Sequence, residues 1–384
     1  MTPETVITNA VLVLEDETVR GTLSFDNTGI KSIDYGGTAL AGAIDAEGDY
    51  LCPGLIEVHT DNLEKHFMPR PGVFWPDGLA AALAHDNDLA GAGITTVYDS
   101  VSAGTPYGKK EYRRSIFGHT MDAITNGAAQ KLFRIEHLIH IRCELSGEKL
   151  IDDVAPYINH PLVRLASLMD HTPGQRQWRN LEDLKRYNKI SKIETDEEFD
   201  TSVREEMETG PLHVARNWPK LAALLAGKNI PLATHDDTTE EDVGQALKMG
   251  AVISEFPTTL EAARSAHMRG METVAGAPNV VRGGSHSGGV SAFELAQMGV
   301  LDGLSSDYVP ASLLQAILKL ERDCALPLHQ TLAMATWKIA DIVGLSDRGH
   351  LRPNLRADLL RFRRMGNTPV VRGLWCNGRA VLQC

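Results

Sequence analysis

Apolar runs alternate with helical patterns along the middle of the chain. Eight runs are short and apolar enough to be buried strands, at 55–59, 95–99, 135–142, 162–169, 230–235, 251–255, 273–277 and 304–307. Each is followed by a segment long enough for a helix, and glycine repeatedly falls where such a helix should end. This alternation over residues 54–350 predicts an α/β fold, a (β/α)8 barrel of the TIM type.

The two ends of the chain share a different pattern. Residues 1–53 contain short β-rich runs separated by turn signals at 27–29 and 36–37. The tail at 351–384 has the same character, and its Asn377-Gly378 dipeptide is typical of a tight hairpin. We therefore predict that both ends together form one small β-sandwich domain attached to the barrel.

A charge-dense segment at 180–208 interrupts the alternation. It has too few apolar residues for a core element and is typical of a solvated helical excursion. Long connections in compact domains are often functional. The segment is therefore a candidate lid over the active-site face, and a plain solvated helix is the alternative.

Composition narrows the class of protein. Hydrophobic residues make up 43% and charged residues 23% of the 384 residues, as in an ordinary soluble globular chain. Scattered cysteines and the lack of a signal-peptide pattern favour a reduced, cytoplasmic protein, and no apolar stretch is long enough for a membrane span. The 38 basic and 50 acidic residues give a net charge of −12, which argues against nucleic acid as a partner.

Polar residues fall at the carboxyl ends of the predicted strands, where barrel enzymes place their catalytic groups. They are His59, Asp61, Glu144, His171, His235, Glu255 and Asp307. Alternate side chains of an extended segment share one face, so His59 and Asp61 offer an imidazole and a carboxylate to one metal ion. This chemistry suits Zn first, with Mn or Fe as alternatives. The competing interpretation is a core histidine beside a helix-capping aspartate.

The sequence around this pair resembles the amidohydrolase superfamily. The apolar strand that carries the P-G-L-I-E-x-H motif at 53–59 and the matching β-rich ends are typical of its members. These enzymes build a metal site at the carboxyl ends of barrel strands. Their usual first motif is H-x-H, whereas Asp61 stands in place of the second histidine here.

Longer blocks are similar to the PhnM family. They lie at 55–63, 69–75, 140–144, 167–176, 234–237, 255–259, 276–288 and 304–312. The resemblance implies hydrolysis of α-D-ribose 1-methylphosphonate 5-triphosphate to the 5-phosphate and diphosphate, in the carbon–phosphorus lyase pathway of phosphonate use. It implies one or two divalent metal ions and an anionic ribose triphosphate as the small-molecule partner, and it is compatible with a homo-oligomer.

The third predicted strand shows the same alternation of side chains. His140, Arg142 and Glu144 lie two positions apart and therefore share one face. Glu144 is a candidate to bridge metal ions, because the fourth strand carries no lysine near its end, and a surface carboxylate is the alternative. Arg142 is a candidate contact for an anionic substrate, and His140 is either a ligand or a structural residue.

Later strand ends supply further candidate ligands. His235 is expected to bind metal, while the two aspartates that follow it either orient it or cap a helix. Glu255 and His171 either ligate or orient. In the superfamily, an aspartate at the end of the eighth strand contacts metal and takes a proton from the attacking water, and Asp307 matches that position as the catalytic base.

A glycine-rich loop at 282–288 is a candidate phosphate site. Arg282, Ser285 and His286 combine a cation, a hydroxyl group and an imidazole with backbone N–H groups that can surround an oxyanion. Barrels often hold phosphate after their late strands, and a plain flexible loop is the alternative. The other candidate substrate cations are Lys65, Arg70, Arg142 and Arg176.

Two other functions are open on this evidence. An amidohydrolase that acts on a C–N bond, such as a cyclic amidase or a deaminase, uses the same metal and water. A third interpretation is a catalytically silent barrel that serves as a subunit of an assembly. The number of candidate metal ligands disfavours it.

Overall fold

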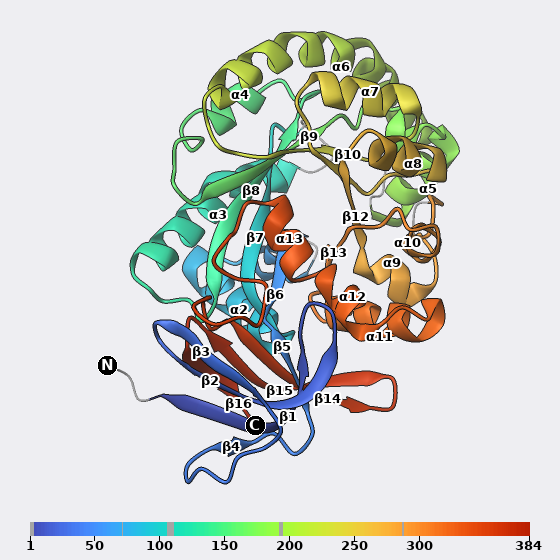
Figure 1. Ribbon diagram of the computed structural model, residues 1–384. Coiled ribbons are helices and arrows are strands. Elements are labelled where there is room, and N and C mark those ends of the chain that lie inside the picture. Colours follow the sequence, from blue (N-terminus) through green and yellow to red (C-terminus); the bar gives the residue numbers. More distant parts are fainter. Residues whose placement is uncertain (1–3, 71, 106–110, 192–194, 286–287) are drawn as a thin grey trace.

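A parallel barrel dominates the computed structural model, which describes residues 4–70, 72–105, 111–191, 195–285 and 288–384 (Figure 1). His286, one of the candidate phosphate contacts, lies outside the described residues. The barrel strands are hydrogen-bonded in chain order. They are β6 (Leu55–Thr60), β7 (Ile94–Ala103), β8 (Glu136–Glu144), β9 (Val163–Met169), β10 (Leu232–His235), β11 (Ile253–Glu255), β12 (Glu272–Gly276) and β13 (Gly303–Ser305). Each overlaps one predicted strand, so the prediction of a (β/α)8 barrel is confirmed.

Helices cover the outside of this sheet. They are α1 (Leu63–Phe67), α2 (Gly78–Gly91), α3 (Glu111–Ala129), α4 (Leu150–Val154), the 3-10 helix η1 (Arg176–Trp178), α5 (Leu181–Ser191), α6 (Asp196–Leu225), α7 (Glu240–Lys248), α8 (Leu260–Met268), α9 (Ala277–Arg282), α10 (Ala292–Gln297), α11 (Ser312–Cys324), α12 (Leu328–Ala333) and α13 (Trp337–Ile342). β7 is consequently buried at every position, which explains why the barrel strands show as continuous apolar runs rather than alternating ones.

The barrel is nearly closed, and its seam lies between β13 and β6. At the carboxyl end the seam is joined directly, because Asp307 N donates to the His59 carbonyl at 3.1 Å and the Asp307 carbonyl accepts from Asp61 N at 3.2 Å. Nearer the amino end another segment fills the gap. There the Met334 carbonyl accepts from Leu304 N at 2.7 Å, and the Ala335 carbonyl accepts from Ile56 N at 2.8 Å. The site residues therefore lie where the barrel is joined most directly.

The two chain ends form one mixed sheet outside the barrel. Its strand order is β16-β15-β14-β5-β1-β2-β3, and β4 pairs with β1. The members are β1 (Thr5–Val13), β2 (Thr18–Asp26), β3 (Gly29–Tyr35), β4 (Ile44–Asp45), β5 (Tyr50–Pro53), β14 (Leu359–Met365), β15 (Thr368–Cys376) and β16 (Arg379–Gln383). The antiparallel pairing of β5 with β14 joins the N-terminal strands to the C-terminal ones. The prediction of a shared β-rich unit is confirmed.

This sheet is strongly curved. Strands β2 and β15 are four places apart in its order, and neighbouring strands lie about 4.8 Å apart, so a flat sheet would separate them by about 19 Å. Yet the rings of Phe25 and Trp375 meet edge to face with centroids 5.8 Å apart. The sheet therefore folds over a core of its own, in the manner of a sandwich, and we call it the cap sheet.

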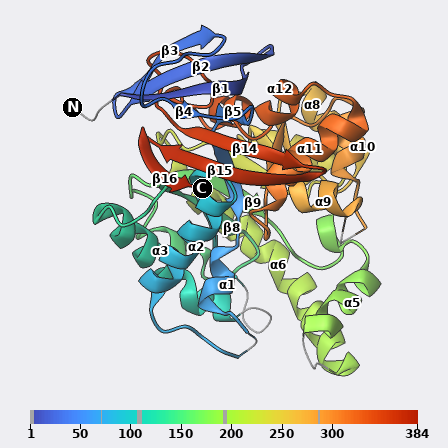
Figure 2. The ribbon, with the colours of Figure 1, turned by 90° about the horizontal axis from the view of Figure 1, so that it is seen from below.

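The cap sheet lies against the amino ends of the first barrel strands (Figure 2). Gly54 N donates to the Asp358 carbonyl at 2.9 Å, and Arg379 donates to the Arg134 carbonyl at 2.9 Å. The carboxyl ends of the strands, which carry the candidate site residues, are at the other end of the barrel. The cap sheet thus supports the barrel without entering the candidate site.

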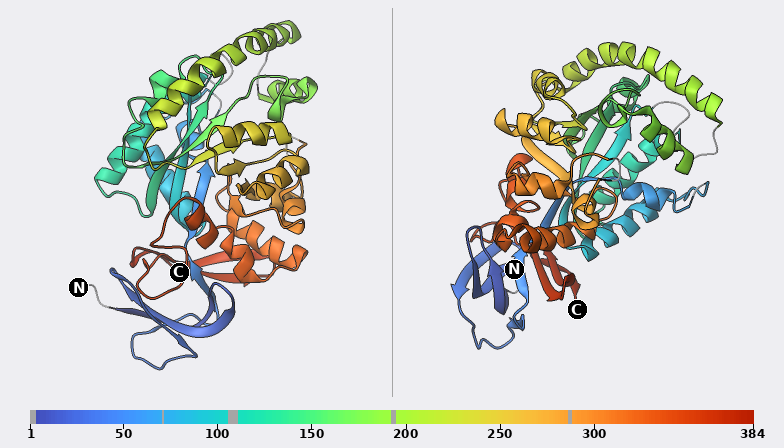
Figure 3. Two further views of the ribbon diagram at one scale, coloured as in Figure 1. Left: turned by 45° about the horizontal axis from the view of Figure 1, so that its top comes forward. Right: turned by 90° about the vertical axis from the view of Figure 1, so that its right-hand side faces the viewer.

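Helices α5 and α6 occupy most of the charge-dense segment. Helix α6 lies at the end of the molecule opposite the cap sheet (Figure 3). It begins with a capping box in which the Thr195 hydroxyl accepts from Glu198 N and the Glu198 carboxylate accepts from Thr195 N. The segment is helical, as its sequence predicts, while its role as a lid stays a prediction. Within the described ranges, no helix combines the length and apolarity needed to span a bilayer.

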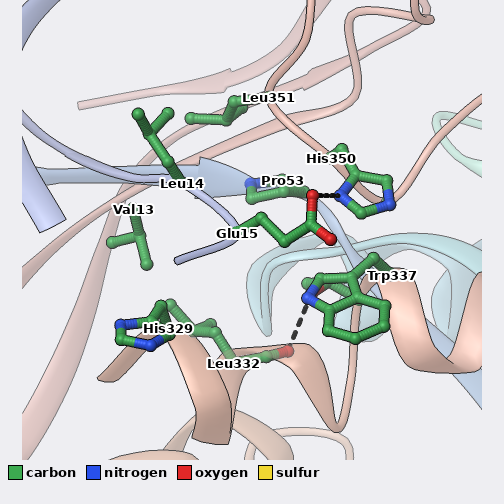
Figure 4. Close-up of a pocket in the computed structure, with 11 residues that line it drawn as sticks. Val13, Leu14, Glu15, Pro53, His329, Leu332, Trp337, His350 and Leu351 are labelled. Carbon is green, nitrogen blue, oxygen red and sulfur yellow. Dashed lines mark hydrogen bonds and ion pairs between the residues drawn. The ribbon is translucent and has the colours of Figure 1, made fainter. Parts of the chain in front are cut away.

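A small pocket lies at the junction of the cap sheet and the barrel. The Trp337 and His350 rings stack in it with centroids 5.6 Å apart, and His350 Nδ1 is 3.6 Å from a Glu15 carboxylate oxygen (Figure 4). None of the candidate metal or substrate residues lines it. This pocket is therefore separate from the chemistry considered next.

Candidate metal centre

Two groups of metal-ligand side chains meet inside the carboxyl end of the barrel. The inner group is His59, His140 and Glu255, and the outer group is His171, His235 and Asp236. In each group the possible ligand atoms all lie within 4.8 Å of one another. The rings of His59 and His235 are 5.4 Å apart between centroids, so the two groups adjoin.

The inner group comes from three strands that are not neighbours in the barrel sheet. His59 lies on β6, His140 on β8 and Glu255 on β11, and all three are buried. His59 Nδ1 is 3.1 Å and His140 Nε2 is 3.9 Å from the same Glu255 oxygen. Side chains of strands β6 and β11 can meet in this way only if they point into the barrel.

The inner group fits a metal ion chemically. Burial lowers the pKa of His140 to about 3, and that of His59 well below its usual value, so both rings are neutral and can donate a lone pair. His140 Nε2 and Glu255 Oε1 are buried and have no hydrogen-bond partner in the described part of the chain. Buried polar atoms without a hydrogen-bond partner destabilise the folded protein unless a ligand binds them. A divalent cation suits one nitrogen and one oxygen ligand.

The outer group is held by Glu144 at the end of β8. His171 Nδ1 is 2.5 Å from one Glu144 oxygen, and the other Glu144 oxygen accepts from His171 N at 3.1 Å. Asp236 Oδ2 lies 2.8 Å from His235 Nδ1 and 3.7 Å from His171 Nε2. Glu144 therefore orients His171, whose second nitrogen faces Asp236.

Charges in the outer group favour a bound cation. Burial opposes a charged imidazole, but Glu144 and Asp236 outweigh it and raise the pKa of His171 to about 9. The same pairing lowers the pKa of Glu144 to about 2, although burial acts against it. A proton on His171 thus occupies the place of a metal ion, and metal binding at this group should release it.

Asp61 lies beside Arg142 rather than within either metal-ligand group. The Arg142 Nη1 atom is 3.8 Å from Asp61 Oδ2. Arg142 itself is buried, and its Nε has no hydrogen-bond partner among the described residues. A buried guanidinium with a spare donor is well placed to receive an oxyanion of a substrate. The shared ion of His59 and Asp61 remains a prediction.

Asp307 and Glu57 lie on the two sides of the barrel seam. Glu57 is fully buried and accepts from His59 N at 2.7 Å and from Ser306 N at 2.6 Å. Burial raises the pKa of Glu57 to about 7. Burial and the charge of Asp61 raise the pKa of Asp307 to about 8. Without a cation beside them, both carboxyl groups therefore bind a proton more readily than exposed carboxyl groups do.

Unusual backbone conformations accompany the site. Asp236, Phe256 and Asp307 all have positive φ angles, of 59°, 53° and 52° respectively. Residues other than glycine rarely adopt this region, and such strain clusters at functional sites. Each of the three follows a barrel strand closely. The Phe256 ring packs 4.9 Å from the His59 ring and 5.3 Å from the His235 ring, between centroids, so these sharp turns help to aim the ligands.

The candidate substrate cations lie in different surroundings. Arg176 donates to the His235 carbonyl at 3.0 Å and is paired with Asp237. Lys65 lies on α1 and contacts the Tyr308 carbonyl. Arg282 ends α9 and is exposed, as is Arg70. The loop that carries Ser285 returns past β11, where Val290 N donates to the Thr258 carbonyl at 2.8 Å.

A relative from Escherichia coli (strain K12), alpha-D-ribose 1-methylphosphonate 5-triphosphate diphosphatase, resembles this chain over its full length. The two are 40% identical over 378 residues, which is 98% of this chain and 100% of the relative. The chain belongs to the PhnM family. No protein-family model matches it.

Solved structures share the fold of this PhnM-family chain. A 5-methylcytosine deaminase from Klebsiella pneumoniae matches with a TM-score of 0.67 and 16% identity, over 99% of this chain and 98% of that one. An N-acetylglucosamine-6-phosphate deacetylase from Pasteurella multocida matches with a TM-score of 0.63 and 12% identity, over 98% and 99%. At these identities the likeness shows the fold alone, an amidohydrolase-type barrel with an added sheet.

Sequence reasoning missed part of this PhnM-family site. Glu57 lies inside the quoted strand motif, two residues before His59, and the alternation that pairs His59 with Asp61 also places Glu57 on their face. Asp236 was expected only to orient a ligand or cap a helix, whereas it lies within the outer group. Outside the two metal-ligand groups, the buried rings of His85 and His137 both hydrogen-bond to Asp99, which ends the 95–99 run.

Proposed function

We propose that this chain hydrolyses α-D-ribose 1-methylphosphonate 5-triphosphate to the 5-phosphate and diphosphate. The observation that carries the proposal is its 40% identity, over essentially the full length of both chains, to the diphosphatase of that name. The two metal-ligand groups and the buried Arg142 support it, because a triphosphate needs cations in a protein of net charge −12.

We further propose that the site binds one or two divalent ions, with zinc the first candidate and manganese or iron the alternatives. His59, His140 and Glu255 would hold one ion, and His171, His235 and Asp236 the other, with Glu144 beside them. Asp61 and Asp307 would complete the set from the seam. When bound, such an ion supplies positive charge beside the phosphoryl oxygens and makes a nearby water easier to deprotonate.

Asp307 is the proposed base. Its carboxyl group follows β13 at the carboxyl end of the barrel, close to Asp61 and Arg142, so it can accept a proton from a water molecule in the site. The oxygen of a water molecule attacks phosphorus, its proton passes to Asp307, and the anhydride bond to the departing diphosphate breaks. Arg142, with its spare Nε donor, neutralises charge that grows on the phosphoryl oxygens.

The test is a product assay with the metal-loaded protein. We expect release of one diphosphate for each ribosyl methylphosphonate triphosphate consumed, and little release from nucleoside triphosphates. Asp307→Asn should lose activity by at least about a hundredfold, the usual contribution of a general base. Asp323→Asn, which changes an aspartate on the surface of α11, is the matched control and should keep full activity.

Other results would contradict this proposal. A metal-loaded, folded protein that releases no diphosphate from this substrate rules it out. Hydrolysis of a cyclic amide or deamination of a base under the same conditions would show instead that the protein acts on a C–N bond. A folded protein that contains no stoichiometric metal would favour the interpretation that the barrel is a catalytically silent subunit.

A further inference from the structure

A chain of hydrogen-bonded polar side chains, buried except at its last member, runs from the outside of the barrel to the edge of the candidate site. It starts at Asp99 on β7, passes through His85 on α2 and Asn62 in the turn after β6, and ends at Lys65 on α1. Asp99, His85 and Asn62 are all at least 97% buried, with exposures of 1%, 0% and 3%. None of them belongs to either metal-ligand group, so their burial calls for another role.

The hydrogen bonds of this chain run in a fixed direction. His85 Nε2 is 2.8 Å from Asp99 Oδ1, and a carboxylate only accepts, so Nε2 carries the proton. His85 Nδ1 is 3.1 Å from Asn62 Nδ2, and an amide nitrogen only donates, so Nδ1 accepts. His85 is thereby held as one neutral tautomer, and its lone pair selects the nitrogen end of the Asn62 amide.

The other end of that amide therefore faces Lys65. Asn62 Oδ1 accepts from Lys65 Nζ at 3.2 Å. The ammonium also contacts the carbonyl of Tyr308 and lies 5.7 Å from the centroid of its ring, within the range of a cation–π contact. Tyr308 directly follows Asp307 in the sequence, so Lys65 is held at the residue next to the proposed base.

The turn that carries Asn62 is itself tied to the seam. Thr60 Oγ1 donates to the Asp307 carbonyl at 2.6 Å, and Asn62 N donates to Thr60 Oγ1 at 3.3 Å. A surface lysine otherwise samples many rotamers and loses that conformational entropy when a ligand fixes it. Holding Lys65 before substrate arrives removes part of that loss.

We propose that His85 and Asn62 are positioning residues, which hold Lys65 beside Asp307 so that its ammonium receives an oxyanion of the polyphosphate. The inference deepens the proposed function and rests on it for the identity of the substrate. Removing either residue should weaken binding of the anion, whereas the rate of the chemical step should change little.

Kinetics of single and double variants test the coupling. Lys65→Met, Asn62→Leu and His85→Phe should each raise KM for the triphosphate about tenfold, which is typical for loss of one charge-assisted hydrogen bond, with kcat within about threefold of its original value. Asn62→Leu combined with Lys65→Met should raise KM no further than Lys65→Met alone. Asn62→Asp keeps an oxygen that accepts from Lys65, but it sets a second acceptor against His85 Nδ1 and adds a negative charge, so it should recover little of the affinity that Asn62→Leu loses.

His137→Gln is the matched control. His137 binds the same Asp99 carboxylate as His85, at 2.7 Å, and is equally buried. It does not contact Asn62, so its loss should lower thermal stability and leave KM unchanged. Additive effects in the double variant, or a rise in KM for His137→Gln equal to that for His85→Phe, would overturn the proposal.

Binding of inorganic diphosphate separates this inference from the proposed function. Calorimetry with the metal-loaded protein should show about tenfold weaker binding in Lys65→Met and Asn62→Leu, and unchanged binding in His137→Gln. This readout needs no turnover. Absence of turnover in the original protein alone would contradict the proposed function, while equal diphosphate binding by the original protein and by Lys65→Met would contradict the positioning role.

Discussion

Single residues in the barrel wall carry charges that their burial opposes. Burial favours a neutral His137, but Asp99 and Asp86 outweigh it and raise its pKa to about 9. Burial also disfavours an ionised Asp99, yet His137 and His85 together lower its pKa to about 2. The pair is thus an ion pair at neutral pH, and Asp99 also accepts from His85 Nε2.

The pH dependence of stability follows from the sign of these shifts. A histidine whose pKa is raised on folding stabilises fully below its unfolded value of 6.5, and that stabilisation is lost as pH rises through about 9. The full shift corresponds to about 3 kcal/mol. We therefore expect the free energy of unfolding, measured with urea, to fall by up to this amount between pH 6.5 and pH 10 because of His137.

The His137→Gln variant isolates this contribution. Other groups that titrate in the same range, including Asp307, are present in both proteins and cancel in the difference. The difference in unfolding free energy between the two proteins should shrink as pH rises. An NMR titration of the His137 ring gives a direct check, and a midpoint below pH 7 would refute the assignment.

Residue types at strand ends could be predicted from the sequence, but their partners could not. His59, Glu255 and Asp307 were identified because each ends an apolar run. The contact of His59 with Glu255 joins positions 196 apart in the sequence, and it depends on how the strands tilt and close. The sequence alone could not assign a role to His85, because a helical histidine among apolar residues has the same pattern whether it is inert or hydrogen-bonded.

At the scale of elements, helix α6 packs closely on the loop that carries His171. Gly210 of α6 is buried, and a Cβ atom placed on it would lie 2.4 Å from Thr172 Oγ1 and 3.0 Å from Thr172 Cγ2. The β-branched threonine cannot turn away freely, so either α6 or the loop must shift. Only a residue without a side chain permits this contact.

Gly210→Ala should therefore destabilise the protein, although alanine favours a helix. We expect a loss of about 1–3 kcal/mol in the free energy of unfolding, as for other overpacked sites, and weaker metal retention, because Thr172 directly follows His171. Urea unfolding and metal content after dialysis measure the two effects. In a Thr172→Ala background the cost of Gly210→Ala should nearly disappear, and an unchanged cost there would contradict the packing argument.

Gly118 of α3 is the matched control for this helix glycine. The nearest atom to a Cβ placed there is Tyr157 Oη at 3.6 Å, which is an ordinary contact. Gly118→Ala should therefore stabilise by about 0.5–1 kcal/mol through helix propensity alone.

The order of elements was readable from the sequence, since strands buried on both faces show as apolar runs with glycine after each helix. The bounds of α5 and α6 were not, because their few buried apolar residues are widely spaced among charged ones and a local cap at Thr195 sets where α6 begins. Nor could the sequence show that Met334 and Ala335 fill the barrel seam, which depends on the three-dimensional closure of the sheet.

For the molecule as a whole, the cap sheet and the barrel share one buried cluster in addition to their separate cores. Val13 and Cys52 of the N-terminal strands and Phe362 of β14 belong to the same buried cluster as Leu89 of α2 and Val97 of β7. Unfolding the cap sheet would expose this part of the barrel to water. We therefore expect the cap sheet and the barrel to unfold in one cooperative transition.

Asp49 offers a way to test that coupling far from the candidate site. This carboxylate is 2% exposed and accepts from Arg361 Nε at 2.7 Å, with Arg363 as its second partner. Asp49→Asn leaves the Arg361 charge buried without its counterion, which typically costs about 3–5 kcal/mol. Glu47→Gln removes the exposed partner of Arg363 and should cost less than about 1 kcal/mol.

In calorimetry, Asp49→Asn should lower the temperature of a single transition without splitting it, and kcat of the folded variant should be unchanged. Two separate transitions would show instead that the cap sheet unfolds independently, and the shared buried cluster would then contribute little to the stability of the barrel.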